Sequence, residues 1–166
     1  MPDWVLTASY SAHMLATVLW IGGIVFQAAL LFPVALKPQF VPEFRKPLAM
    51  LRSRFQPLAW LSLAVLIGSG LTQMTANANY SGLLAIENRW SVAILLKHMG
   101  FAGMVGVMAY QTWVLYPRWS RLELILAHSD QATFDPGLLR RESVLMRVQL
   151  LLSILVLILT AIARTS

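Results

Sequence analysis

The 166-residue sequence contains no cysteine and few charged side chains. The lack of cysteine excludes disulfide bonds, thiolate metal sites and cysteine nucleophiles. Charged residues make up 12% of the chain and hydrophobic residues 58%, which leaves too little polar surface for a soluble domain of this size. The seven acidic residues all fall in predicted loops or at the ends of predicted helices. We therefore expect no buried acid and no hydrolytic chemistry.

Four long apolar stretches dominate the rest of the chain, at 5–36, 57–76, 90–116 and 145–163. Each is long enough to cross a hydrocarbon layer about 30 Å thick. They predict an all-α membrane protein, a single domain over residues 1–166, folded as an up-down bundle of four transmembrane helices. Prolines at positions 38, 42, 47 and 57 are expected to prevent a continuous helix between the first two stretches.

The segment after the third stretch also has helical features. Leu122, Ile125 and Leu126 recur at helical spacing, which predicts that the third helix continues or that an interfacial helix follows. Asp135 is a suitable N-cap for a helix with Pro136 in its first turn. The last helix is therefore expected to begin before its apolar stretch does.

The net charge of +6 is concentrated in the loops on one side of the predicted membrane. By the positive-inside rule this side faces the cytoplasm, so both termini should lie outside it. The expected partners of the basic loops are phospholipid headgroups of the bilayer, not nucleic acid. The basic residues concerned are Lys37, Arg45, Lys46, Arg52, Arg54, Arg118, Arg121, Arg140, Arg141 and Arg147.

The chain also contains a tandem repeat of polar and proline positions, with halves at about 1–76 and 90–164. The first copy reads His13-Met14, then Gln27-x-x-x-Leu31-Phe32-Pro33, then Arg54-x-Gln56. The second reads His98-Met99, then Gln111-x-x-x-Leu115-Tyr116-Pro117, then Arg147-x-Gln149, 84 to 93 residues downstream. Such a repeat predicts a pseudo-twofold axis along the membrane normal.

This symmetry predicts that His13 and His98 face each other across the bundle. Each follows a tryptophan, Trp4 or Trp90, by eight or nine residues. Because tryptophans favour the membrane interface and a helix rises 1.5 Å per residue, both histidines should lie about 12 Å below it. The first and third helices are diagonal in such a bundle, and that spacing favours a haem held by two histidines over a bare metal ion.

Other residues are expected to complete this haem site. Thr17 and Trp20 share a helical face with His13, and Ala102 leaves room beneath His98. Lys97 and Arg89 lie at or above the histidines and are expected to bind the haem propionates.

Two other interpretations remain open. Copper could bind His13 and His98 with Met14, Met74 and Met99, because imidazole and thioether groups are suitable Cu(I) ligands. Alternatively, the protein is a structural subunit without metal, in which a histidine forms a hydrogen bond between helices. His128 lies in a cytoplasmic amphipathic segment, where we expect it at the solvated surface.

The chain resembles the CopD-type (copper resistance protein D) membrane domain and its relative, the HemJ-type protoporphyrinogen oxidase. The resemblance covers nearly the whole length. The motifs that carry it are His13-x6-Trp20-x-Gly22-Gly23, Arg52-x-Arg54-Phe55, Gly70-Leu71, Trp90, Leu96-Lys97, Arg147 and Leu157-x-Leu159-Thr160-Ala161.

The resemblance implies two activities. CopD-like proteins are associated with copper uptake or homeostasis in the bacterial inner membrane, and HemJ-like proteins bind haem b through a histidine that matches His13. The chain departs from the HemJ pattern, because Ser11-Ala12 stands where lysine commonly precedes the histidine, and Lys97-His98 reverses a histidine-lysine order. We therefore expect a haem b protein without oxidase activity. It would serve electron transfer or act as a subunit of a membrane redox complex, with other subunits or a second copy as partners.

Overall fold

The computed structural model describes residues 2–37, 41–77, 80, 82, 86, 89–128 and 136–165, with only the backbone described at 41–46, 126–127 and 136. The first rod comprises α1 (Asp3–Val25), the π-helical turn η1 (Phe26–Leu31) and α2 (Phe32–Ala35). The second is α3 (Val41–Thr75). The third comprises α4 (Arg89–Tyr110), the π-helical turn η3 (Gln111–Leu115) and α5 (Tyr116–His128), and the fourth is α6 (Pro136–Thr165).

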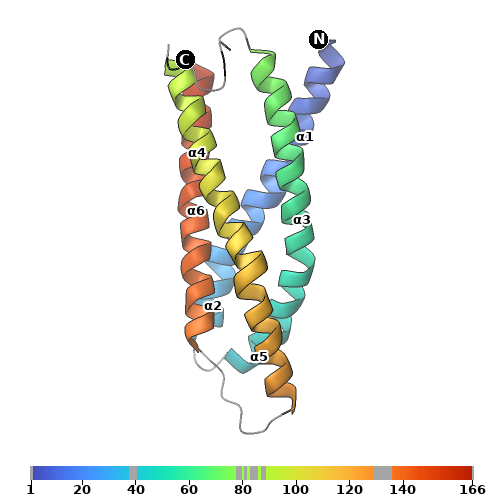
Figure 1. Ribbon diagram of the computed structural model, residues 1–166, viewed down its shortest axis with the longest axis vertical. Coiled ribbons are helices and arrows are strands. Elements are labelled where there is room, and N and C mark those ends of the chain that lie inside the picture. The colour runs from blue at the N-terminus through green and yellow to red at the C-terminus, as the bar shows by residue number, and fades with distance from the viewer. Residues whose placement is uncertain are drawn as a thin grey trace.

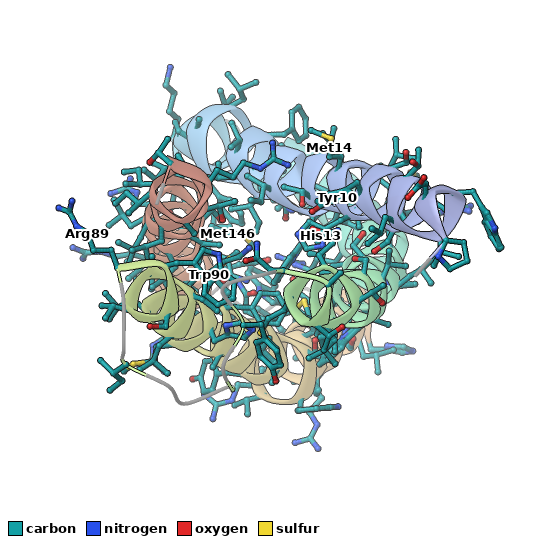
Figure 2. All side chains as sticks on the ribbon, turned by 90° about the horizontal axis from the view of Figure 1, so that it is seen from above. Tyr10, His13, Met14, Arg89, Trp90 and Met146 are labelled. Atoms are coloured by element: carbon teal, nitrogen blue, oxygen red, sulfur yellow. The ribbon has the colours of Figure 1, made fainter. Side chains whose placement is uncertain are left out.

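The four rods lie side by side as an up-down bundle (Figure 1). Each is long and apolar enough to cross a membrane, which confirms the predicted fold class. We call the end where α1 begins and α6 finishes the termini end, and the opposite end the loop end. The most extensive packing joins α1 to α3 and α4 to α6, so each half of the chain is a helical hairpin. Seen along the bundle, α3 and α6 lie on opposite sides (Figure 2).

The expectation that the prolines at 47 and 57 would break the helix is wrong. Both Pro47 and Pro57 lie inside α3. An interior proline removes one backbone hydrogen bond, and a long membrane helix tolerates this loss because neighbouring helices support it. The extension of the third rod is confirmed by α5, and α6 begins at Pro136, whereas its predicted cap Asp135 lies outside the described residues.

The two copies of the glutamine and proline motif adopt the same local structure. In both rods a π-helical turn begins at or next to the glutamine and ends just before the aromatic-proline pair. A π turn widens the helix by one residue, and a following proline, which donates no hydrogen bond, fits such an irregular stretch. Gln27 and Gln111 are both buried at these turns.

Burial along the rods gives the register between the two halves. In the first and third rods, residues 84 apart share the same burial: Ala16 with Gly100, Trp20 with Met104, Ile24 with Met108, Gln27 with Gln111, and Ala35 with Trp119. In α3 and α6 the interval is 90: Leu48 with Leu138, Arg52 with Glu142, Ala59 with Gln149, Leu63 with Ser153, and Leu66 with Val156. This register differs from the predicted pairing of the Arg-x-Gln segments, whose interval is 93.

Candidate functional site

His13 lies half-buried on α1 and faces the inside of the bundle (Figure 2). Its Nδ1 atom is 2.8 Å from the hydroxyl oxygen of Ser69 on α3. The single hydroxyl hydrogen of Ser69 is donated to the carbonyl oxygen of Val65 at 2.5 Å. Ser69 must therefore accept from His13, so the hydrogen of the neutral imidazole is on Nδ1 and the lone pair is on Nε2.

The surroundings of His13 are polar and tightly packed. A Cβ atom on Gly70 would lie 3.6 Å from the imidazole Cε1, so the ring rests against the backbone of α3. The hydroxyl of Ser9 donates to the Ser69 carbonyl at 3.1 Å, and the Gln73 amide donates to the Ser9 carbonyl at 3.2 Å. These bonds hold α1 to α3 and fix the position of the imidazole.

Two cationic side chains lie near the same end of the bundle. Lys97 on α4 is half-buried and close enough to His13 to act on it electrostatically. Arg164 on α6 acts on Lys97 in the same way, and its guanidinium lies 6.0 Å from the ring centre of Tyr10 on α1. The termini end therefore combines an imidazole on α1 with a lysine and an arginine from the other hairpin.

The structure does not bring His98 together with His13. His98 is exposed on α4, and its Nδ1 lies 2.7 Å from the carbonyl oxygen of Ile94 in its own helix. In the 84-residue register His13 corresponds to Lys97, and His98 corresponds to Met14, which is also exposed. Matching the two histidines shifts the register by one residue, which turns a side chain by about 100° around the helix.

The other residues expected to bind haem are dispersed. Thr17 donates its hydroxyl to the carbonyl of His13 at 2.7 Å, within its own helix. Trp20 is buried and packs edge-on against Phe101, with ring centres 5.7 Å apart. Arg89 and Ala102 are exposed.

The interface marker used for the depth of His98 also differs from expectation. Trp4 is 74% exposed, as a membrane-interface residue would be, but Trp90 is only 6% exposed. Because Trp90 packs inside the protein, its position does not mark the membrane interface. The depth predicted for His98, which was counted from Trp90, is therefore not supported.

The methionines of the copper interpretation do not gather around His13. Met14 and Met99 are 63% and 64% exposed, and of the three methionines only Met74 is buried. Among the described residues, no group of three or more histidine, aspartate or glutamate side chains is placed to hold a metal ion. His128 is exposed at the end of α5.

A second polar centre lies near the loop end and corrects the expectation of no buried acid. Glu142 on α6 is fully buried, and both its carboxylate oxygens accept hydrogen bonds from Arg52 on α3, at 2.8 and 2.5 Å. The guanidinium also lies 4.2 Å from the ring centre of Trp119, and Glu123 is 3.9 Å away. This pair joins two diagonal helices across the centre of the bundle.

The sequence contains a signal for the burial of Glu142. Leu139, Glu142, Met146 and Gln149 recur at intervals of three and four residues, so they share one helical face. All four are buried. A carboxylate on the apolar face of a helix requires a partner charge, so this pattern predicts an arginine or lysine at the same depth.

Replacing Ser69 by alanine should lower the free energy of unfolding by about 0.6 to 1.7 kcal/mol, the range measured for hydrogen bonds between membrane helices. The substitution removes the acceptor for His13 Nδ1 and leaves the packing nearly unchanged. Thermal unfolding in detergent micelles measures the effect. Ser53→Ala is the matched control, since the exposed Ser53 hydroxyl bonds only within its own helix. Equal effects of the two substitutions would contradict a role for Ser69 between helices.

The chemical capacity of the termini end is that of a single neutral nitrogen ligand next to positive charge. No family model, no curated protein and no solved structure matches this chain.

Proposed function

We propose that this chain is a multi-pass protein of the bacterial inner membrane that binds b-type haem through His13 and serves electron transfer within a membrane redox complex. The observation that carries the proposal is the orientation of His13. Ser69 accepts the Nδ1 hydrogen, which leaves the Nε2 lone pair for an iron ion. Histidine ligands of metals almost always donate their other ring N–H to an oxygen in this way.

The basic side chains at the termini end would attract an anionic group, and this supports a ligand that carries one, such as a haem propionate. Lys97 is within electrostatic range of His13, and Arg164 is within range of Lys97. When bound, haem supplies one-electron transfer. The protein positions the ligand nitrogen through Ser69 and provides the cations. The resemblance to HemJ-like proteins, in which the first-helix histidine binds haem b, supports the same residue.

His98 does not fit as the second ligand of an iron held between α1 and α4, because it is exposed and its Nδ1 lies against a carbonyl of its own helix. The proposal therefore assigns haem ligation within this chain to His13 alone. The repeat, in contrast, predicted ligation by both His13 and His98.

The distribution of basic residues supports a cytoplasmic loop end and extracytoplasmic termini. Several exposed arginines lie near the loop end. They include Arg54 on α3, Arg118 and Arg121 on α5, and Arg140 and Arg141 on α6. Under the positive-inside rule they face the cytoplasm, where anionic lipid headgroups are their partners. His13 then lies in the extracytoplasmic half of the membrane.

The test is the absorbance spectrum of the protein purified from cells supplied with haem precursor. We expect a Soret band in the native protein, its loss in His13→Ala, and its retention in His98→Ala, which is the matched control. A native protein without a Soret band, or a band that survives His13→Ala, would overturn the proposal.

Elemental analysis of the same samples separates the alternatives. Iron in the native protein and none in His13→Ala supports the haem proposal. Copper without iron would support a CopD-like role in copper transport or homeostasis instead. Neither metal would support the structural subunit, in which the bond from His13 to Ser69 only joins two helices.

A further inference from the structure

Two buried glutamine side chains near the middle of the bundle have unpaired polar atoms. Gln111 in η3 and Gln149 in α6 are 2% and 1% exposed. The Nε2 of Gln149 donates to the Met104 carbonyl at 3.2 Å, but its Oε1 has no hydrogen-bond partner among the described residues, and neither has the Nε2 of Gln111. Leaving such a group unpaired costs about 1–3 kcal/mol, so the two atoms require a partner.

The orientation of the Gln149 amide is determined by its surroundings. If its oxygen and nitrogen were exchanged, the amide oxygen would face the Met104 carbonyl, and two acceptors would lie together. The unpaired atom of Gln149 is therefore an acceptor. At Gln111 the buried atom without a partner is the amide nitrogen Nε2, which is a donor. A ligand between them must accept one hydrogen bond and donate another.

Both glutamines line one cavity between the rods. Its volume is about 20 Å³, more than the roughly 10–15 Å³ that a single water molecule needs. The walls come from all four rods, including Trp20, Ala59, Met108 and Met146, and no charged side chain lines them. The small volume excludes a lipid or cofactor, and the uncharged walls disfavour an ion.

We propose that this cavity is a binding site for one water molecule that accepts from Gln111 Nε2 and donates to Gln149 Oε1. The water joins the π-helical turn η3 to α6 in the second hairpin. The described residues of the first half form no equivalent site, because Gln27 donates to the Gly23 carbonyl of its own helix at 3.2 Å and the counterpart of Gln149 is Ala59. The site is independent of the proposed haem ligand.

X-ray radiolytic footprinting with mass spectrometry tests the proposal. The X-ray pulse converts water into hydroxyl radicals, which oxidise side chains in contact with that water even when bulk solvent cannot reach them. Met108 and Met146 line the cavity and are 5% and 3% exposed. Met74 is 7% exposed and does not line it, so it is the internal control. We expect Met108 and Met146 to be oxidised faster than Met74 in the native protein.

In the double variant Gln111→Leu/Gln149→Leu, the oxidation of Met108 and Met146 should fall to the level of Met74. Gln27→Leu is the matched control and should leave their oxidation unchanged. Native oxidation rates no higher than that of Met74, or undiminished rates in the folded double variant, would overturn the proposal. The comparison within the native protein remains decisive even if the double variant does not fold.

Discussion

Replacing Glu142 by glutamine is expected to lower the free energy of unfolding by about 3–5 kcal/mol, because it leaves the buried charge of Arg52 without its partner. Both oxygens of this fully buried carboxylate accept from Arg52, which is itself only 8% exposed. Glutamine can accept one of these hydrogen bonds but cannot neutralise the guanidinium. Chemical unfolding in detergent micelles, followed by tryptophan fluorescence, measures the loss.

Two controls separate the buried pair from general effects of charge removal. Arg54→Gln on the exposed side of α3 and Glu123→Gln, whose side chain is 38% exposed and 3.9 Å from Arg52, should each cost less than about 1 kcal/mol. Replacing both partners, as Arg52→Met/Glu142→Leu, should recover most of the stability, since no unpaired charge remains. A cost for Glu142→Gln as small as that of Arg54→Gln would show that the pair does not hold the bundle together.

Replacing Gly23 by alanine should lower the free energy of unfolding by about 1–3 kcal/mol, the usual cost of overpacking a core. A Cβ atom at this position would lie only 1.9 Å from Cε2 and 2.3 Å from Cζ of Phe55. The partly buried Phe55 ring packs against the central core formed by α1, α3, α4 and α6, so moving the ring aside disturbs these contacts. Thermal unfolding of the purified protein measures the effect.

The adjacent glycine provides the matched control. A Cβ atom on Gly22 would meet no atom within 4 Å, and alanine is favoured over glycine inside a helix by about 1 kcal/mol. Gly22→Ala should therefore leave stability unchanged or raise it. If Gly23→Ala were also neutral, the close approach of α1 to Phe55 would not be required for folding.

The membrane-spanning rods were predictable because hydropathy is a local property. Each predicted stretch lies within or nearly within one observed rod, and α5 and the start of α6 were also expected from local spacing. The break expected at Pro47 and Pro57 was wrong. A proline opposes a helix by local geometry, but tertiary packing supports α3 near both positions: Phe55 lies against Gly23 of α1, and Leu48 packs in the core near the loop end.

The candidate site was only partly predictable. His13 faces the inside of the bundle (Figure 2), and its bond to Ser69 connects segments 56 residues apart that only tertiary packing brings together. The pairing of His13 with His98 was predicted from motif similarity. The two histidines are 85 residues apart, whereas the two glutamines are 84 apart, and this difference of one residue decides which side chains correspond. Glu142 was expected to lie at the end of a helix rather than in the core, whereas the structure buries it fully and pairs it with Arg52.

The sequence by itself determined which four stretches can span the membrane, and that the two halves share a glutamine and proline motif. These features depend on apolar length, proline and glutamine positions, and neighbouring residues. Only the tertiary structure decided which way each helix faces. One residue of register rotates a side chain by about 100°, so the choice between Lys97 and His98 as the counterpart of His13, and the meeting of Arg52 with Glu142, depend on packing among all four rods.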